Sequence, residues 1–444
     1  MPGEDGPLFN LKAVVQQTGL KPDTLRAWER RYNLPTPQRS PGRHRLYSQR
    51  DVDTIQWLVA RQREGLSISR AVELWQQMEA QGRDPLEYPA PTARTTFPAP
   101  LPGSAGETLD QLREGWIGAC LDFDEARAEQ TLAQAFALYA PETVAIELLQ
   151  KAVSEIGQGW YEGSVTVQQE HFSSALAIRR LEALVMAAPP PARPGRILAA
   201  CPPQESHVFG LLLLTFLLRR RGWEVVYLGA NVPGDQLETT VTAINPQLVI
   251  LAAQQLHSAA TLLDLARLLE RSGTPLAYGG LIFNLLPALR DRIPGHFLGD
   301  RLDLVPQTVE TLLTAPRPPE PVVPIDEQYN QAREHFGQQE SLIQAGLVQA
   351  RTSVGAEPQH LALAHRELAV NIDAGLALGD LGFVGTDLDW LKGLLGNRGQ
   401  STAPLREYLV TYHQAAREHL DERGEPIVAW LEHVIRENGF DRAA

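Results

Sequence analysis

The sequence predicts a multidomain chain: a winged helix-turn-helix domain, a helical bundle, an α/β domain with a doubly wound parallel sheet, and an all-α C-terminal domain. Three observations predict this architecture. The 444 residues are too many for one ordinary core. Proline-rich breaks divide the chain into four blocks. Strand-like runs alternate with helical segments in the third block, whereas the second and fourth blocks carry helical periodicity.

Composition marks the joints between the blocks. Residues 86–105 are dominated by Pro, Ala, Thr and Ser without periodicity, which is typical of a linker. Shorter proline-rich breaks lie at 189–195 and 316–324. The predicted domains are therefore 8–85, 106–188, 195–315 and 325–444.

Charge is distributed unevenly. The chain has a formal net charge of −13, yet residues 20–50 hold eight Lys or Arg against Asp23 and Glu29. The two cysteines, Cys120 and Cys201, lie far apart, so neither a disulfide framework nor a thiolate zinc site is expected. No N-terminal signal segment or apolar run of membrane-spanning length stands out, so we expect a cytoplasmic protein without a membrane partner.

The basic N-terminal block has the pattern of two helices joined by a turn. A short apolar helix ends near Thr18, and a second helix starts at 21–23 with Asp23 as its expected N-cap. Such a second helix lies in the major groove, where arginines reach base edges and phosphates, and the Pro/Gly-rich excursion after it is a wing for backbone or minor-groove contacts. A helical pair with a solvated basic face is the alternative. The candidate DNA-contacting residues are Thr24, Arg26, Arg30 and Arg31 on the helix and Arg39, Arg43, His44, Arg45 and Tyr47 on the wing.

The order of residues in this block resembles a known family. TGLKPDTLRAWERRYNL at 18–34 and PGRHRLYS at 41–48 are similar to the winged DNA-binding domain of MerR-type transcription regulators. The resemblance implies binding to a double-stranded DNA operator with two half-sites. The long dimerisation helix and the metal-binding cysteines of metal-sensing members are absent, so assembly into a homo-oligomer, dimer or tetramer, is expected to come from the later domains.

The third block predicts an open parallel sheet. Strand-like runs at 196–200, 224–228, 248–252 and 275–278 are separated by helix-length segments. Ligands of such Rossmann-like or flavodoxin-like sheets bind outside the carboxyl ends of the strands. The motif ESHVFG at 205–210 lies at that edge, where Glu205, Ser206 and Gly210 are expected to supply a helix cap and a permissive backbone. A neutral imidazole there is a good ligand for a transition metal, especially beside a carboxylate, although a lone His207 is also an ordinary cap or surface residue.

ESHVFG resembles the Asp/Glu-x-His-x-x-Gly signature of cobalamin-binding domains. That resemblance implies that His207 is the lower axial ligand to cobalt, that Glu205 accompanies it, and that Gly210 lets the backbone approach the corrin. Gly279 and Gly280 match the glycine pair that lines the nucleotide-tail cleft in this family. After the third strand, Gln254 or Gln255 stands near the position where Ser or Thr is common.

The second block carries a motif that is unremarkable residue by residue. Trp160, Glu170 and His171, taken singly, are ordinary residues of a helical bundle. Together they resemble the Trp-x9-Glu-His signature of the cap in light-responsive, cobalamin-dependent MerR-type repressors of the CarH/LitR type. This implies adenosylcobalamin under a helical cap, with photolysis changing oligomeric state and DNA affinity. Many members carry a histidine directly after the Trp, whereas this chain has Tyr161.

The fourth block is helical by pattern. Residues 376–399 and 405–420 resemble the globin-like C-terminal domain of photocobilins, which implies biliverdin or another linear tetrapyrrole as a second chromophore. His360 and His365 are the candidates for contacting its carboxylates or pyrroles. A dimerisation or spacer bundle is the alternative.

These patterns together favour a light-responsive transcription regulator rather than an enzyme. One alternative is a regulator that senses cobalamin without light. Another is a corrinoid methyltransferase or mutase subunit, which shares the histidine and the sheet. The DNA-binding motif and the lack of a substrate-barrel pattern oppose the enzyme.

Overall fold

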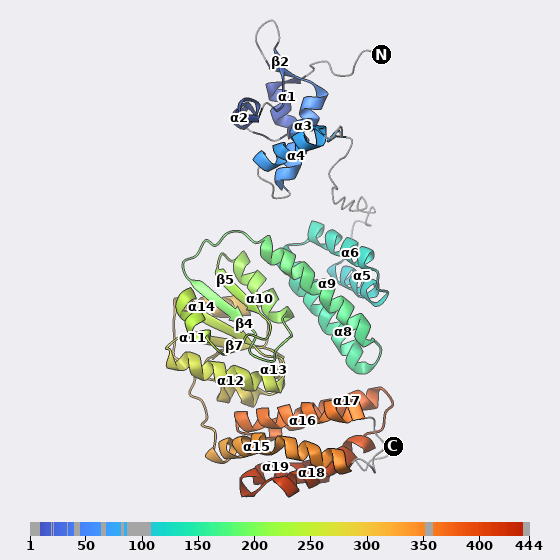
Figure 1. Ribbon diagram of the computed structural model, residues 1–444, viewed down its shortest axis with the longest axis vertical. Helices are drawn as coiled ribbons and strands as arrows, with labels where there is room; N and C mark the ends of the chain where they lie inside the picture. The colour runs from blue at the N-terminus through green and yellow to red at the C-terminus, as the bar shows by residue number, and fades with distance from the viewer. Residues whose placement is uncertain are drawn as a thin grey trace. The chain divides into compact units, whose positions relative to one another are not determined.

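The computed structural model describes residues 9–18, 20, 22–32, 34–39, 45–63, 68–80, 84–86, 108–350 and 358–437. The chain divides into two compact units, Met1–Leu101 and Pro102–Ala444 (Figure 1). Within the described residues, no helix is both long and apolar enough to cross a bilayer.

The N-terminal unit is a small helical domain with a three-stranded antiparallel sheet in the order β1-β3-β2. Leu25, Trp28 and Trp75 are buried in its core, where the ring of Trp75 meets that of Trp57 edge-on. The second helix begins at Pro22, so Asp23 lies inside it and the expectation that Asp23 caps it is wrong. The elements are β1 (Phe9–Asn10), α1 (Leu11–Thr18), α2 (Pro22–Tyr32), β2 (Gln38–Arg39), β3 (Arg45–Tyr47), α3 (Gln49–Arg63) and α4 (Ile68–Ala80).

The second unit starts with the helical cap. Capping boxes at Thr108 and Thr166 start its first and last helices, and Gly163 ends α8 in the left-handed conformation at φ +82°. The cap shares one apolar core with α10 of the sheet domain, through residues such as Leu213 and Phe216. Its elements are α5 (Leu109–Leu121), α6 (Glu125–Leu138), α7 (Pro141–Thr143), the π-helical η1 (Val144–Gln150), α8 (Lys151–Glu162) and α9 (Val167–Met186).

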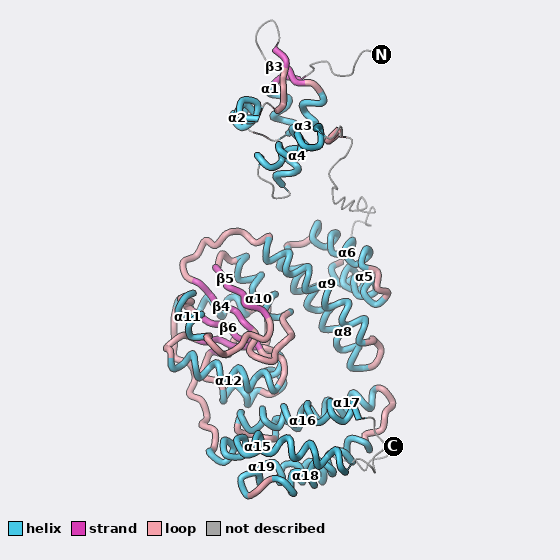
Figure 2. Tube along the Cα trace, in the orientation of Figure 1, coloured by secondary structure: helices cyan, strands magenta, loops and turns pink. Residues whose placement is uncertain are grey.

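A five-stranded parallel sheet follows, in the order β5-β4-β6-β7-β8. The four expected strands are confirmed to within one residue, and the two-residue β8 is an addition. Helices α10 and α14 pack on one face and α11 and α12 on the other, so the sheet is doubly wound. Figure 2 shows the strands with α10, α11 and α12 around them. The elements are β4 (Arg196–Ala200), α10 (Phe209–Arg220), β5 (Glu224–Gly229), α11 (Leu237–Ile244), β6 (Leu248–Ala252), α12 (Leu256–Arg271), β7 (Leu276–Gly279), α13 (Leu281–Leu285), the 3₁₀ turn η2 (Pro287–Arg292), β8 (His296–Phe297) and α14 (Val305–Thr314).

The strand order places a topological switch point between β4 and β6, because the chain leaves β4 toward β5 on one side and β6 pairs with β4 on the other. Ligands of open α/β sheets bind at such a point, outside the carboxyl ends of the strands. The ESHVFG loop follows β4 directly, so the fold sets it at this point.

The C-terminal domain is helical, as the sequence predicts. Its helix α16 lies along α12 of the sheet domain, and the apolar core runs without a break from the sheet into the bundle. The elements are α15 (Glu327–Ala350), α16 (Pro358–Leu378), α17 (Gly382–Asn397), α18 (Ala403–His419), the 3₁₀ turn η4 (Glu422–Gly424) and α19 (Glu425–Glu437).

Candidate functional site

A cavity of about 1380 Å³ lies at the carboxyl ends of the strands. Its walls come from the cap, the loops of the sheet domain and helices α16 to α18 of the C-terminal domain. This volume exceeds what a drug-sized ligand needs, so the cavity has room for a large cofactor. Of the predicted cofactor residues, these line it: Glu170, His171, His207, Gly210, Gln254, Gly279 and Gly280.

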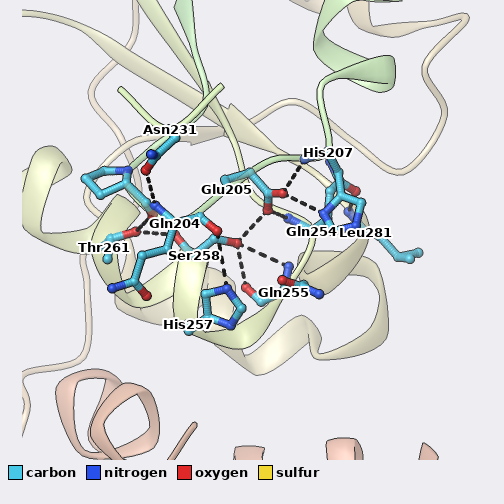
Figure 3. A network of polar contacts seen from close by, with 11 residues as sticks. Gln204, Glu205, His207, Asn231, Gln254, Gln255, His257, Ser258, Thr261 and Leu281 are labelled. Carbon is cyan, nitrogen blue, oxygen red and sulfur yellow. Dashed lines mark hydrogen bonds and ion pairs between the residues drawn. The ribbon is translucent and has the colours of Figure 1, made fainter. Parts of the chain in front are cut away.

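His207 is held in one orientation by a buried carboxylate. The Nδ1 atom of His207 lies 2.7 Å from Oε1 of Glu205, and the backbone N–H of His207 donates to the same oxygen at 2.8 Å (Figure 3). Because a carboxylate accepts at Nδ1, the hydrogen-bond pattern assigns the ring proton to Nδ1 and leaves the lone pair on Nε2. The side chain of His207 is 55% exposed and lines the cavity. The Nε2 atom of His207 can therefore donate its lone pair to a metal ion.

Glu205 joins the loops that follow β4 and β6. Its other oxygen, Oε2, accepts from the backbone N–H of Gln254 and from Oγ of Ser258, each at 2.6 Å. The side chain of Glu205 is fully buried, and α10 begins after Val208 without a side-chain cap. The expectation that Glu205 or Ser206 caps this helix is therefore wrong, since the carboxylate is used in fixing His207.

The charge state of the pair follows from these contacts. Burial alone would raise the pKa of Glu205, but the hydrogen bonds from His207, Ser258 and two backbone N–H groups outweigh it and hold this pKa at about 2. The hydrogen bond to Glu205 in turn raises the pKa of His207. An ionised Glu205 at neutral pH makes the imidazole a stronger donor to a metal.

The floor of the cavity depends on glycine and on Gln254. Gly280 has φ +123°, and a Cβ there would collide with the backbone of Ala253, so no larger residue fits. A Cβ on Gly210 would meet no atom within 4 Å. The side-chain oxygen of Gln254 accepts from the backbone N–H of Leu281 at 2.9 Å, which ties the loop after β6 to the loop after β7. Gln254 also lines the cavity, and its side-chain amide carries N–H donors as well as this oxygen.

The cap contributes polar side chains from the first two turns of α9. Nδ1 of His171 lies 2.9 Å from Glu170, whose other oxygen accepts from Ser174 at 2.7 Å. Trp160 does not line the cavity. Its ring packs against Trp390 of α17, with centroids 5.9 Å apart, and Trp390 itself lines the cavity. Sequence reasoning missed Trp390, because no local pattern connects a residue of α17 with the cap.

The C-terminal part of the wall is largely apolar but contains buried polar groups that lack hydrogen-bond partners among the described residues. The hydroxyl of Tyr408 and Oδ1 of Asn371 are buried, and neither has a hydrogen-bond partner among the described residues. Burial, followed by the nearby charge of Glu367, raises the pKa of Asp387 to about 6. Buried polar groups without partners are uncommon in native proteins and point to a bound ligand or water.

The two histidines considered for a bilin lie differently. His365 is buried beside Tyr412 and does not line the cavity. The nearest carboxylate, that of Glu340, is 3.9 Å from Nε2, which is too far for a hydrogen bond, and burial lowers the pKa of His365. A neutral imidazole is therefore expected at this position. His360 lies on α16, but its side chain is outside the described residues.

In the N-terminal unit, α2 presents Arg26, Arg30 and Arg31 at the surface and Thr24 half-buried. Tyr47 is fully buried, and its hydroxyl donates to Glu29 at 2.6 Å. The expectation that Tyr47 contacts DNA is therefore wrong, since a ring in the core anchors the wing instead. Arg45 is bound to the same carboxylate at 2.8 Å. The side chain of Arg39, and Arg43 and His44 altogether, lie outside the described residues.

Comparison with known proteins shows which families these domains resemble. Residues 9–78 match the MerR HTH family regulatory protein model, and residues 112–185 and 195–300 match two B12 binding domain models. The chain is 31% identical over 298 residues to the HTH-type transcriptional repressor CarH of Myxococcus xanthus. This match covers 65% of this chain and 94% of CarH. The chain belongs to the cobalamin-binding, MerR-type transcription regulators. Among such regulators, CarA of Myxococcus xanthus is 32% identical over 248 residues, covering 55% of this chain and 76% of CarA.

The named relatives of this regulator are transcriptional repressors, so it is grouped with regulators rather than with enzymes. A solved structure that it matches is the monomethylamine corrinoid protein of Methanosarcina barkeri, at 16% identity and a TM-score of 0.38, over 46% of this chain and 98% of that one. The matched family ranges end at residue 300, so the C-terminal helical domain lies beyond them.

The residues of this regulator fit a cobalamin. A cobalamin held here would need one imidazole with a free nitrogen as its protein ligand, and His207, which lines the cavity and whose Nδ1 is held by Glu205, would supply Nε2. Gly210, Gly279 and Gly280 keep the adjoining wall free of side chains.

We expect His207→Ala to abolish axial ligation by the protein. The variant should take up adenosylcobalamin in the dark with the absorbance of a cobalamin that lacks a histidine ligand, and Glu205→Gln should weaken binding by about 10- to 100-fold, because the partner that orients the imidazole loses its charge. Absorbance titration measures both effects.

His257→Ala is the matched control for this experiment. His257 also lines the cavity, but its Nε2 lies 3.3 Å from the backbone oxygen of Gln204. This variant should keep the histidine-ligated spectrum. If the spectrum of His207→Ala equals that of the unchanged protein, His207 is not the ligand.

Proposed function

We propose that this chain is a light-responsive repressor of the CarH type, in which photolysis of adenosylcobalamin changes oligomeric state and DNA affinity. The observation that carries the proposal is the locked imidazole of His207, which shares one cavity with Glu170 and His171 of the cap. Adenosylcobalamin, when bound, supplies a cobalt–carbon bond that light can break. A homo-oligomer, dimer or tetramer, is the acting form, and the cytoplasm is where it meets its operator.

The protein's own part in the switch is mechanical. The loop that holds His207 leads straight into α10, and Leu212, Leu213 and Phe216 of α10 belong to the same apolar core as the cap. The loop that holds His207 and the cap are thus connected through one apolar core. Ligands that differ in size or in their contacts with the cavity therefore favour different positions of the cap. Such a difference in contacts is what shifts a population between two states.

Glu170 and His171 border the adenosyl side in this proposal, and Gly279, Gly280 and Gln254 border the nucleotide tail. Tyr161 is turned toward α17 rather than toward the cavity, because its ring lies against Trp390 and its backbone oxygen accepts from Asn397. We therefore do not assign it the capture of cobalt after photolysis. His171, whose side chain is 75% exposed, is the cap imidazole that reaches the cavity.

The decisive measurement is a light–dark comparison of the full chain with adenosylcobalamin. Green light should change the absorbance bands and the mass measured by light scattering together, because the cap contacts depend on what fills the cavity. The same illumination with hydroxocobalamin, which has no cobalt–carbon bond, should change neither. A chain that binds adenosylcobalamin but keeps its mass in the light would instead be a light-independent cobalamin sensor.

We further propose that α2 reads the operator with Arg26, Arg30 and Arg31, with Thr24 beside them and Arg39, Arg43, His44 and Arg45 on the wing. The exposed arginines of α2 support this, since a second helix of this kind lies in the major groove.

Arg26→Ala should weaken operator binding by roughly 10-fold or more, as expected for the loss of one base or phosphate contact of about 1–3 kcal/mol. Fluorescence anisotropy at several salt concentrations measures it, and a phosphate contact would also lower the salt slope by about 1. Arg271→Ala, which removes the same charge from an exposed position of α12 in the other unit, should leave affinity unchanged. Equal affinities for both variants would contradict the assignment of α2.

A second candidate function is bilin binding by the C-terminal domain, to biliverdin or another linear tetrapyrrole. The Tyr408 hydroxyl and the Asn371 oxygen, which have no hydrogen-bond partner in the described part of the chain, support a polar ligand in this part of the cavity, as does the raised pKa of Asp387. Pyrrole N–H groups are donors, and Asn371 and Asp387 offer acceptors. His360 stays a candidate contact, whereas His365 would have to turn toward the cavity.

The raised pKa of Asp387 has a definite effect on stability. The folded chain binds this proton more tightly than the unfolded chain, for which the pKa is near 3.8. Below about pH 4 the carboxyl therefore does not lower the free energy of unfolding. The free energy of unfolding falls as the pH rises toward 6, and above that it is lower by about 1–3 kcal/mol.

Asp387→Asn should accordingly raise the Tm at pH 8, leave it nearly unchanged at pH 4, and weaken binding of biliverdin. Thermal unfolding and absorbance titration measure the two effects. Asp389→Asn, which alters an exposed carboxylate of the same helix, is the control and should change neither. If Asp387→Asn stabilises the chain but binds biliverdin as before, Asp387 does not contact the bilin.

A further inference from the structure

The cap and the C-terminal domain meet at a cluster of aromatic side chains. Trp160 and Tyr161 lie in the last turn of α8, and Trp390 lies on α17. The ring centroid of Trp390 is 5.9 Å from that of Trp160 and 5.6 Å from that of Tyr161, with interplanar angles of 32° and 30°. The guanidinium of Arg398 lies 5.4 Å from the centre of the Trp160 ring, and Asn397 donates to the backbone oxygen of Tyr161 at 3.2 Å.

Gly393 allows this contact. A Cβ on Gly393 would collide with the hydroxyl oxygen of Tyr161 and would also crowd the ring carbon that bears it. Glycine in a helix interior costs about 1 kcal/mol relative to alanine. Gly385 and Gly396 on the same helix would meet no atom within 4 Å if they carried a Cβ. Gly393 is thus the position on α17 where the missing side chain makes room for the cap.

Of the two tryptophans, Trp390 lines the cavity and Trp160 does not. Trp160 is half-buried against Trp390, whereas Trp390 is 45% exposed and lines the cavity together with its neighbour Leu391. An exposed indole on a cavity wall gains free energy when a ligand covers it.

We propose that the C-terminal domain supplies Trp390 as an aromatic wall of the cobalamin chamber, and that the Tyr161–Gly393 contact is the clasp that docks it there. The proposal rests on cobalamin occupying this cavity. It adds a binding residue from outside the two domains that match B12-binding models, and it gives Tyr161 a role as a docking residue.

Docking and cofactor binding are then coupled. If a docked α17 strengthens cobalamin binding by some factor, bound cobalamin must strengthen docking by the same factor. A cap that shifts would also have to break the clasp, because Tyr161 belongs to the cap and Gly393 does not.

Gly393→Ala in the full chain tests the clasp. The added methyl group should push α17 away from α8, which should raise hydrogen exchange in residues 382–397. Adenosylcobalamin affinity in the dark should fall about tenfold, the effect of losing roughly one aromatic contact. Gly396→Ala is the matched control, since its methyl group enters open space, and it should change neither quantity.

A second substitution distinguishes the clasp from general damage. Tyr161→Phe removes the oxygen that the new methyl group would strike, so the double variant Gly393→Ala, Tyr161→Phe should recover most of the protection and affinity. Trp390→Ala should lower the affinity for adenosylcobalamin about as much as Gly393→Ala does. Adding Tyr161→Phe to Trp390→Ala should not restore this affinity.

Each possible result bears on one part of the proposal. Exchange and affinity equal to those of Gly396→Ala would overturn the clasp. Increased exchange with unchanged affinity would overturn Trp390 as a wall of the chamber. If the unchanged protein does not bind cobalamin at all, the proposed function fails, while the exchange comparison between Gly393→Ala and Gly396→Ala still tests the docking.

Discussion

The buried carboxylate of Glu205 is the constraint on which the rest of the site depends. It accepts from the ring and backbone of His207 with one oxygen and from Gln254 and Ser258 with the other. Burying a charge without such partners would be costly, so the four donors must stay in place for the chain to keep its fold here. The same contacts that keep Glu205 ionised also fix the imidazole. Stability and ligand geometry are thus set by one group, and the loops on either side of the switch point cannot move independently.

The cavity that this loop faces is a shared space. The sheet domain supplies its floor, α8 and the N-terminal half of α9 one wall, and helices α16 to α18 another. None of these three parts encloses it alone. A cofactor in such a space contacts all three at once, and its loss or chemical change alters the energy of each contact. The arrangement suits a sensor, because the signal needs no separate pathway from the site to the surfaces that move.

The sequence predicted local features well and contacts between distant residues poorly. Runs such as Leu248–Ala252 are apolar throughout, so their strands were predicted correctly, and the short β8 offered too few residues for a pattern. The motif around His207 predicted the imidazole that the structure places at the cavity. The network of Glu205 joins residues 49 and 53 positions apart, and nothing near Glu205 in the sequence points to Gln254 or Ser258. Tyr47 was misassigned because a basic neighbourhood does not reveal that its ring enters the core. The Trp160–Trp390 contact spans most of the second unit and has no local sign.

Helix α12 packs against both the sheet and the C-terminal domain. Leucine and alanine are buried around most of its circumference, including Ala259, Leu263 and Ala266, as in a helix covered on every side. One side rests on the sheet and α16 covers another. A chain that ended before α15 would leave that second side in water, where it would favour aggregation. A variant without this bundle would need polar residues along the exposed side of α12 to stay in solution. The C-terminal domain is thus a cover for its neighbour's apolar surface rather than an independent module.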